Sequence, residues 1–221
     1  MAMAHRIGGI PLATVQRLPI YLKVLREMRR AGRQIVSSAA LAHLLRLDPV
    51  QVRKDFGRLG QAGRPRIGFA IAALIGAIEA RLDWGRVNAA VLLGAGHLGQ
   101  ALLGYQGFAL HGLEITAAFD PSPRVAGRRL HGIPIHPLED LEARLPALGA
   151  RMAILATSPW AAQETAERLA LAGIEGIWNF TGEILTLPPR VLVQDQDIAI
   201  GLAVLSSRLC TRVGGAPPLS A

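Results

Sequence analysis

The segment that decides the fold is VLLGAGHLGQA, which occupies residues 91–101. An apolar run precedes its glycines, and small or apolar residues follow them, which predicts a strand, a tight turn and a helix. In the G-x-G-x-x-G spacing, the first glycine permits the sharp turn. The second lets the backbone approach a pyrophosphate, and the third lets the helix pack closely on the strand. We therefore expect a dinucleotide to bind this loop through its phosphates, and the loop consists of Gly94, Ala95, Gly96, His97, Leu98 and Gly99.

Strand and helix patterns alternate through the second half of the chain. The expected strands cover residues 88–93, 114–119, 152–157, 176–180 and 191–194, and the expected helices cover residues 97–106, 138–145 and 161–171. This alternation predicts an α/β fold with a parallel, doubly wound sheet of the Rossmann type. The alternative is a sheet of this kind whose glycine turn binds nothing.

Asp120 ends the second expected strand in the segment LEITAAFD. Its carboxylate can accept hydrogen bonds from the hydroxyl groups of an adenosine ribose, and it would repel a 2′-phosphate. We therefore expect NAD(H) as the cofactor. Arg124 is close enough in the sequence to leave NADP(H) open.

The positive charge of the chain is concentrated in its first 86 residues. The net charge is +8, but residues 1–86 carry 15 Lys and Arg against 5 Asp and Glu, whereas residues 87–221 carry 9 against 11. Such asymmetry points to a polyanionic partner for the first part. A basic surface that is merely solvated is the alternative.

Three helices are expected in this basic part. Residues 13–30 carry an apolar stripe of Leu18, Tyr21, Leu22, Leu25 and Met28. Ser37 or Ser38 caps a second helix that runs to Arg46, with Leu41, Leu44 and Leu45 directed inward. Asp48 and Pro49 begin a third helix, on which Val52, Phe56 and Leu59 face the core.

The third helix is the expected DNA reader. Gln51, Arg53, Lys54 and Arg58 lie away from its apolar stripe, and amide and cationic groups are those that read base edges and bind phosphates. The turn RPRIGF after it, with Arg64 and Arg66, predicts the basic hairpin of a winged helix-turn-helix. An ordinary three-helix core with solvated charges is the alternative.

Composition and chemistry limit the class of protein. The chain is 51% hydrophobic, and its single cysteine, Cys210, excludes an internal disulfide and fits a reducing compartment. Its first residues lack the apolar core of a signal peptide, and its longest apolar run, residues 69–78, is too short to span a bilayer. We expect a soluble cytoplasmic protein.

The residues give little sign of an enzyme. The expected loops are short, and fewer than thirty residues follow the last expected strand, which leaves little room for a substrate pocket. His111, His131 and His136 are expected in turns, and His97 lies at the phosphate end of the loop. We expect no catalytic residue and no metal site, and a sensor fits better than a dehydrogenase.

The chain ends in a further expected helix that begins at Asp197. Ile198, Leu202, Leu205 and Leu209 form one apolar stripe on it. This stripe must be buried either against the chain's own sheet or against a partner. The pattern alone leaves both open.

Taken together, these segments resemble the Rex family of bacterial redox-sensing transcriptional repressors. The resemblance runs from about Ile10 to Leu209. The matching segments, in order, are IPLATVQRLPIYLKVL, SSAALA, QVRKDFGRLGQAG, LLGAGHLGQALLGYQGF, AFDPSP, ATSPWAAQ, AGIEGIWNF and VQDQDIAIGL. Several motifs in one order are far more specific than any one of them.

The resemblance implies a homodimer with winged-helix domains, Rossmann domains that bind NAD(H), and a C-terminal helix exchanged between subunits. It implies that NADH releases the dimer from a double-stranded operator with an inverted repeat. By position, Arg17, Ser38, Arg53 and Lys54 match DNA contacts, and Tyr105 matches a tyrosine near the nicotinamide. Asp197 matches an aspartate linked to the redox response, and Thr157, in ATSPW, is a further candidate cofactor contact.

The chain also departs from the family pattern. Members often carry Ser-Tyr-Phe-Gly where this chain has residues 57–60, GRLG, and an Arg-Gly or Lys-Gly pair where it has Arg64-Pro65-Arg66. These changes remove aromatic contacts and add charge, so the operator preference can differ. His97 stands where some members have Arg.

The leading hypothesis is an NADH-responsive repressor without membrane association. It has a DNA-binding domain over residues 1–84, an NAD(H)-binding domain over residues 85–196, and a dimerisation helix and tail over residues 197–221. A small NAD-dependent oxidoreductase is the second hypothesis, and a CoA-binding subunit of similar fold is the third.

Overall fold

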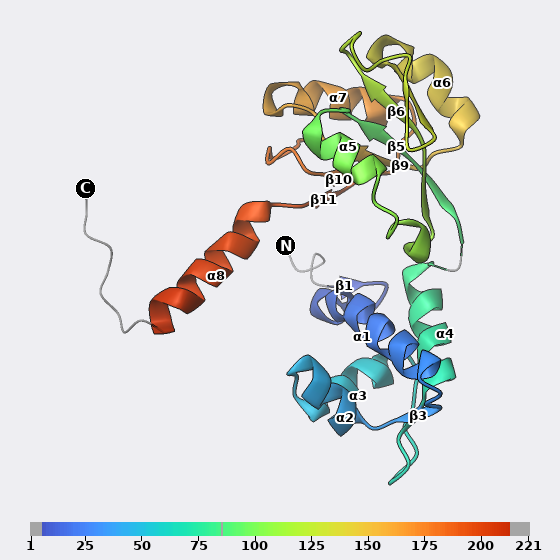
Figure 1. Ribbon diagram of the computed structural model, residues 1–221, viewed down its shortest axis with the longest axis vertical. Coiled ribbons are helices and arrows are strands. Elements are labelled where there is room, and N and C mark those ends of the chain that lie inside the picture. The colour runs from blue at the N-terminus through green and yellow to red at the C-terminus, as the bar shows by residue number, and fades with distance from the viewer. Residues whose placement is uncertain (1–5, 85, 213–221) are drawn as a thin grey trace. The chain divides into compact units, whose positions relative to one another are not determined.

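The computed structural model describes residues 6–84 and 86–212. The chain divides into two compact units, Met1–Arg86 and Val87–Ala221 (Figure 1). The division falls two residues after the first domain boundary expected from the sequence. Residues 213–221, the expected tail, lie outside the described residues.

The N-terminal unit packs helices around one apolar core. In chain order its elements are β1 (Arg6–Ile7), β2 (Ile10–Pro11), α1 (Leu12–Arg30), β3 (Ile35–Val36), α2 (Ser38–Leu45), α3 (Pro49–Arg58), β4 (Phe69–Ala70) and α4 (Ile71–Leu82). The predicted stripe of α1 is confirmed, because all five of its members are buried. Val52 and Phe56 of α3 are also completely buried in this core.

Side-chain caps fix the starts of α2 and α3 as the sequence predicts. The Ser37 hydroxyl accepts a hydrogen bond from the Ala40 N–H at 3.0 Å, and the Asp48 carboxylate accepts one from the Val50 N–H at 2.6 Å. Pro49 is the first residue of α3. Such caps satisfy backbone donors that have no partner inside the helix.

The basic turn after α3 forms a hairpin. Arg64 bridges Gly68 in an antiparallel pairing, and β4 then pairs antiparallel with β3. Phe69 of β4 packs its ring edge-on against Phe56, with ring centroids 5.1 Å apart. The hairpin is therefore attached to the core of the unit, as the wing of a winged helix must be, and this prediction is confirmed.

One expectation about this unit is wrong, and one of its helices was not expected. Leu44 does not point inward, because its side chain is 57% exposed. A fourth helix, α4, occupies the apolar run of residues 69–78, for which the sequence indicates only that it is too short to span a bilayer. Its buried residues Ile71, Leu74, Ile75 and Ile78 have helical spacing, and they belong to the same core as α1.

The C-terminal unit contains a seven-stranded sheet in the order β11-β10-β9-β5-β6-β8-β7. Its strands are β5 (Asn88–Leu93), β6 (Leu113–Asp120), β7 (Arg129–Leu130), β8 (Ile133–Pro137), β9 (Met152–Leu155), β10 (Gly176–Asn179) and β11 (Leu192–Asp195). All neighbouring pairs are parallel except β7 with β8. The chain moves outward from β5 in one direction through β6 and β8, and in the other through β9, β10 and β11. This confirms the doubly wound fold and puts its switch point between β5 and β9.

Helices cover both faces of this sheet. They are α5 (His97–Leu103), α6 (Leu141–Leu148), α7 (Pro159–Leu171) and the short turns η2 (Ala109–His111) and η3 (Leu138–Asp140). One apolar core joins α6 and α7 to the sheet, and a second core on the other face includes Leu103 of α5 and Phe108 before η2. The sheet thus has a core on each face, as a parallel sheet requires.

The strands β7 and β8, the first and second from one edge of the sheet, were not expected from the sequence. The segment IPIHP of β8 contains two prolines, which argue against a strand. His136 lies in β8 and not in a turn, so that expectation is wrong, and its ring packs against Phe119 with centroids 5.6 Å apart.

The last described element is α8 (Ile198–Arg212), which confirms the expected C-terminal helix. Its apolar residues remain uncovered in the single chain: Leu202 is 65%, Leu205 56% and Leu209 52% exposed. In the part of the chain that the structure describes, no helix combines the length and apolarity needed to cross a bilayer.

Candidate functional sites

The glycine loop lies at the switch point of the sheet. Gly94 follows β5 directly, and its backbone has a φ of +93°, which L side chains rarely adopt. A Cβ atom there would lie 2.6 Å from the carbonyl oxygen of Ala156, just after β9. Only glycine therefore lets the end of β5 pass so close to the end of β9.

The other two glycines differ in what surrounds them. A Cβ atom on Gly99 would overlap the carbonyl oxygen of Gly94, so this position has no room for a side chain. Gly96 precedes α5 and has no atom within 4 Å of its Cβ position. The protein itself does not require a glycine at Gly96, but a ligand that approaches the backbone there would.

Asp120 is joined to the glycine loop. One carboxylate oxygen accepts a hydrogen bond from the Ala95 N–H at 2.6 Å, and the other accepts one from the Ser122 N–H at 2.8 Å. The side chain is almost completely buried at 8% exposure. Each oxygen keeps lone-pair capacity, so the carboxylate can still accept hydrogen bonds from a ribose. Its role in holding the loop was not expected from the sequence.

Thr157 provides an unsatisfied polar atom at this edge. Its hydroxyl oxygen is buried and has no hydrogen-bond partner among the described residues. Its backbone nitrogen lies 2.8 Å from the Cβ position of Gly94, so the residue is next to the loop. A buried hydroxyl without a partner is costly, and a bound polar group would satisfy it. The loop, Asp120 and Thr157 therefore fit a dinucleotide.

The remaining candidate cofactor contacts are exposed to solvent or lie away from the glycine loop. His97 and Leu98, at the start of α5, are exposed. Tyr105 is 57% exposed and follows the other end of α5. The structure therefore does not bring Tyr105 to the glycine loop.

Tyr105 begins a series of aromatic contacts that sequence reasoning missed. Its ring packs against Phe108, Phe108 packs against Trp178, and Trp178 packs against Phe180, with centroid separations of 4.9, 5.8 and 4.9 Å. Phe180 follows β10 at the same edge of the sheet as Thr157. The series thus runs from Tyr105 toward the edge where the dinucleotide is expected.

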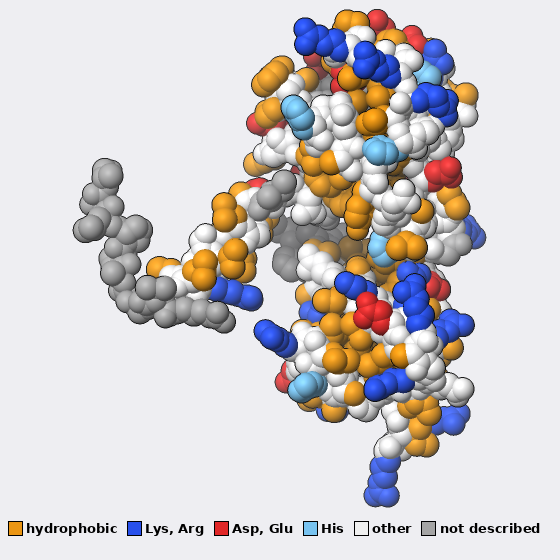
Figure 2. Space-filling view, viewed as in Figure 1, with side chains coloured by type: hydrophobic (Ala, Val, Ile, Leu, Met, Phe, Trp, Pro, Cys, Tyr) orange, Lys and Arg blue, Asp and Glu red, His pale blue; other side chains and the backbone are white. Residues whose placement is uncertain are grey.

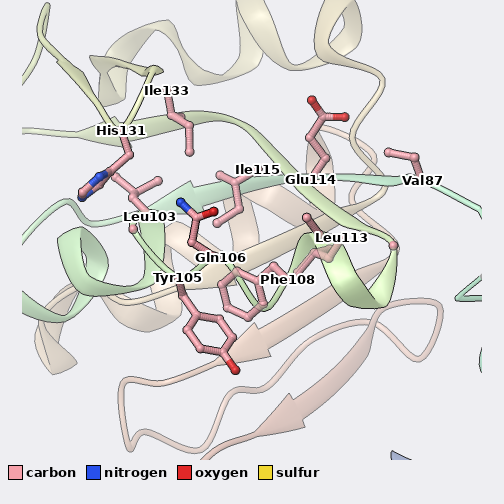
Figure 3. A pocket seen from close by; sticks show the side chains of 13 residues that line it. Val87, Leu103, Tyr105, Gln106, Phe108, Leu113, Glu114, Ile115, His131 and Ile133 are labelled. Atoms are coloured by element: carbon pink, nitrogen blue, oxygen red, sulfur yellow. The ribbon is translucent and has the colours of Figure 1, made fainter. Parts of the chain in front are cut away.

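Tyr105 also lines a cavity of about 400 Å³ (Figure 3). Leu113, Glu114 and Ile115, at the start of β6, contribute to its wall, and so does His131. The glycine loop follows the end of the parallel strand β5. The cavity therefore lies toward the opposite end of the strands from the loop.

On α3, the side chains of Arg53 and Lys54 are exposed. Arg53 donates a long hydrogen bond of 3.5 Å to the hydroxyl of Ser38, at the start of α2. Three of the residues matched to DNA contacts are thus close on two neighbouring helices, because Lys54 adjoins Arg53. The exposed Arg64 and Arg66 lie in the hairpin, and Figure 2 shows cationic side chains at its tip.

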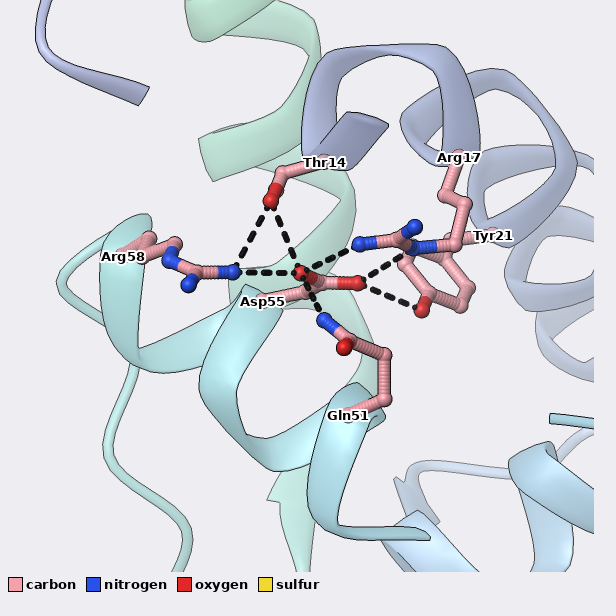
Figure 4. Close-up of polar contacts among 6 residues, drawn as sticks. All are labelled: Thr14, Arg17, Tyr21, Gln51, Asp55 and Arg58. Atoms are coloured by element: carbon pink, nitrogen blue, oxygen red, sulfur yellow. Dashed lines mark hydrogen bonds and ion pairs between the residues drawn. The ribbon is translucent and has the colours of Figure 1, made fainter. Parts of the chain in front are cut away.

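Three other expected DNA contacts converge on a buried carboxylate (Figure 4). Arg17, Gln51 and Arg58 all donate hydrogen bonds to Asp55, which is completely buried. They are therefore not free outward side chains, as their position in the sequence suggested. Whether they also contact DNA stays a prediction.

The same carboxylate accepts hydrogen bonds from two hydroxyl groups, Thr14 and Tyr21, each at 2.9 Å. Burial alone would raise the pKa of the Asp55 carboxyl, but hydrogen bonds from Arg17, Tyr21 and Thr14 outweigh it and hold this pKa below its ordinary value. Burial and the bond to Asp55 raise the pKa of Tyr21. Asp55 is therefore an ionised acceptor, and sequence reasoning did not single it out.

Asp197 caps the C-terminal helix. Its exposed carboxylate accepts a hydrogen bond from the Ala199 N–H at 2.7 Å. Among the residues that the structure describes, no group of three or more His, Cys, Asp or Glu could hold a metal ion.

Two family models match the chain. The model described as "Putative DNA-binding protein N-terminus" matches residues 9–57, and "CoA binding domain" matches residues 87–182. The redox-sensing transcriptional repressor Rex of Treponema denticola is 40% identical over 204 residues, which make up 92% of this chain and 97% of that protein. The Rex repressor of Streptomyces avermitilis is 36% identical, over 92% of this chain and 81% of that protein.

Solved structures are similar over the same extent. The crystal structure of RSP in complex with β-NAD⁺ and operator DNA has a TM-score of 0.86 and 28% identity, over 92% of this chain and 94% of that one. RSP in complex with β-NADH has a TM-score of 0.83 and 28% identity, over 92% of this chain and 95% of that one.

Proposed function

The chain belongs to the Rex family of redox-sensing transcriptional repressors, and on that premise we propose that it represses transcription from an inverted-repeat operator and leaves it when NADH binds. One observation supports the proposal most strongly. A single chain contains a winged-helix unit and a Rossmann unit, and the glycine loop of the Rossmann unit lies at the switch point of its sheet. RSP, similar over nearly the whole chain, has been solved with each redox form of the cofactor and with operator DNA.

We assign NAD(H) binding to the loop of residues 94–99 together with Asp120 and Thr157. Backbone N–H groups of the loop would hold the pyrophosphate, and Asp120 would accept from the adenosine ribose. The Thr157 hydroxyl would donate to the cofactor at the edge next to Phe180. When bound, the dinucleotide supplies a nicotinamide ring whose redox state differs between NAD⁺ and NADH.

We assign operator binding to α3, to the start of α2 and to the hairpin. The contacts proposed are Arg17, Ser38, Gln51, Arg53, Lys54, Arg58, Arg64 and Arg66. The exposed cations Arg53 and Lys54 supply attraction to phosphates, which is independent of sequence. The wing cations Arg64 and Arg66 extend this surface beyond α3.

We propose that the protein is a homodimer joined through α8. The exposed Leu202, Leu205 and Leu209 form an apolar stripe that is uncovered in the single chain. An inverted repeat is matched by a protein with two-fold symmetry, so we propose that a partner subunit buries the apolar stripe of α8. Asp197, at the start of α8, would then connect this helix to the redox response.

Catalysis is not part of this proposal. A dehydrogenase needs a substrate pocket and a proton-handling group beside the nicotinamide. The cavity with His131 and Glu114 lies toward the opposite end of the strands from the glycine loop. Since a repressor acts on DNA, we also propose that the protein works in the cytoplasm, where the DNA of its bacterial relatives lies.

Selection of DNA tests this function. The full-length protein is mixed with duplexes that contain a random central segment, and the bound duplexes are sequenced after several rounds. An enriched inverted repeat supports the proposal, and enrichment without symmetry contradicts it. CoA tested beside NADH for binding separates a dinucleotide sensor from a CoA-binding subunit.

A further inference from the structure

The buried Asp55 carboxylate joins α1 to α3. Thr14, Arg17 and Tyr21 are spaced along one face of α1, and all three donate to it. From α3 itself, Gln51 and Arg58 donate to it at 2.9 and 3.1 Å. One completely buried side chain thus organises the contact between the first helix and the expected DNA-reading helix (Figure 4).

We propose that Asp55 is a positioning residue that sets the sequence specificity of operator binding. It fixes the orientation of three side chains of the DNA-binding surface, namely Arg17, Gln51 and Arg58. Asp55 itself, without exposed surface, does not touch DNA. The inference rests on the proposed function, because specificity has meaning only if the protein binds an operator.

The chemistry of a carboxylate determines how Gln51 is presented. An ionised carboxylate can only accept hydrogen bonds, so the amide must turn its nitrogen toward Asp55. The amide oxygen and the second N–H of the nitrogen then remain for another partner. One acceptor beside one donor is the pattern that pairs with N6 and N7 of adenine in the major groove.

The two arginines are also fixed in direction. Arg17 uses Nε and Nη2 in a two-bond fork to Asp55, at 2.7 and 2.9 Å, which leaves its Nη1 donors. Arg58 directs Nη1 to both Asp55 and Thr14, at 3.1 and 3.0 Å, which leaves Nε and Nη2. A planar guanidinium held in this way keeps its remaining donors in one direction.

The cluster has a different electrostatic character from the rest of α3. Two guanidinium groups share one carboxylate, so the cluster keeps a single net positive charge. In the described ranges, the ion pairs of the chain include neither Arg53 nor Lys54. Together with Arg64 and Arg66 of the hairpin, these two cations supply most of the general attraction to phosphates, whereas the Asp55 cluster supplies discrimination.

The experiment compares Asp55→Asn with the unchanged full-length protein. The probes are a palindromic duplex that the unchanged protein selects from a random library and a scrambled duplex of equal length and composition. We expect the ratio of the two affinities to fall about 10-fold or more, since the loss of an oriented base contact has that size. Affinity for the scrambled duplex should not fall, because no cation is removed.

Asp48→Asn is the matched control. It removes one negative charge from the same helix, while asparagine still caps α3. Its affinity ratio should equal that of the unchanged protein. A fall of the ratio in Asp48→Asn equal to that in Asp55→Asn would overturn the proposal, because net charge would explain both.

The remaining outcomes separate this inference from the proposed function. An unchanged ratio in folded Asp55→Asn overturns the inference alone, whereas an unchanged protein that selects no palindrome overturns both. Circular dichroism checks folding. If Asp55→Asn does not fold, Tyr21→Phe takes its place, since it removes one donor to Asp55 from a completely buried side chain that is not among the proposed DNA contacts. A reduced ratio in Tyr21→Phe supports the proposal, and an undiminished one overturns it.

Discussion

The backbone N–H of Ala95 donates a hydrogen bond of 2.6 Å to the carboxylate of Asp120. The residue expected to select the cofactor therefore also holds the loop expected to bind its phosphates. Because Ala95 follows β5 and Asp120 ends β6, this bond connects two neighbouring strands at the edge where ligands bind in such sheets. The carboxylate expected to bind the ribose and the loop expected to bind the phosphates are thus directly hydrogen-bonded to each other.

Substitution of Asp120 should separate these two roles. Asp120→Asn keeps an acceptor for the Ala95 N–H, but it turns an amide NH2 toward the Ser122 N–H and removes the charge that repels a 2′-phosphate. We expect a weaker preference for NADH over NADPH and a smaller loss of NADH affinity than in Asp120→Ala, measured by calorimetric titration. Asp120→Ala should weaken the preference and also lower NADH affinity, because the loop loses its anchor. Equal binding of both cofactors by the unchanged protein would contradict the assignment.

Gly96 and Gly99 form a natural pair for testing the loop. Gly96→Ala should leave thermal stability unchanged, because no atom lies within 4 Å of its Cβ position, yet it should reduce NADH affinity by blocking the approach of the pyrophosphate. Gly99→Ala should lower stability as well, since its Cβ would overlap Gly94. Undiminished NADH affinity in Gly96→Ala would show that phosphates do not lie there.

Lys54 should contribute to operator affinity and not to cofactor binding. Replacing this exposed side chain by Ala should cost about 1–3 kcal/mol of binding free energy if it contacts a base. Lys23→Ala, at the chain's other lysine, removes the same charge from α1 and should cost less. Both are measured by fluorescence anisotropy at fixed salt. Equal losses would mean that α3 is not the reading helix.

The Asp55 cluster should make the stability of the N-terminal unit depend on pH. The pKa of this carboxyl is lowered in the folded protein, from about 3.9 for an unperturbed Asp. Its stabilisation is therefore complete above about pH 5 and is lost progressively as the pH falls through the ordinary and then the lowered value.

Asp55→Asn should accordingly destabilise the unit at neutral pH by about 3 kcal/mol, as breaking a buried ion pair does. The difference from the unchanged protein should shrink as the pH falls from 5 to 3. Hydrogen exchange in α1 and α3 of the intact chain measures both effects. A difference that grows toward low pH would contradict the assigned direction.

Truncation before Asp197 tests the role of α8. The shortened protein should be monomeric by light scattering and should bind a palindromic duplex poorly, because the exposed apolar stripe of α8 is removed. It should still bind NADH, because the loop of residues 94–99, Asp120 and Thr157 all remain in the shortened chain. A truncated protein that remains dimeric would show that α8 is not the dimer contact.

The periodic elements could be predicted from the sequence, because apolar spacing directly records which side of a helix or strand is buried. The stripe of α1 and the strand β5 before the glycines are of this kind. β8 could not be found in this way, since two prolines among its five residues resemble those of a loop.

The loop residues could be predicted from the sequence, whereas the Asp55 cluster could not. The spacing of Gly94, Gly96 and Gly99 reflects local backbone geometry, which a short motif can encode. Asp55 bonds to residues of α1 that lie 34 to 41 positions away in the sequence, and only the packing of α1 on α3 brings them together. A single acidic residue in a cationic helix is a weak sign of such a cluster, but it is the one sign that the sequence offered.

The central claim is that the redox state of the dinucleotide controls operator binding. The direct measurement is the fluorescence anisotropy of a labelled palindromic duplex bound by the full-length protein, titrated separately with NADH and NAD⁺ at fixed salt. The account predicts that NADH releases the duplex, whereas NAD⁺ at the same concentration leaves it bound. Equal release by both forms, or release by neither while NADH binds the protein, would contradict it.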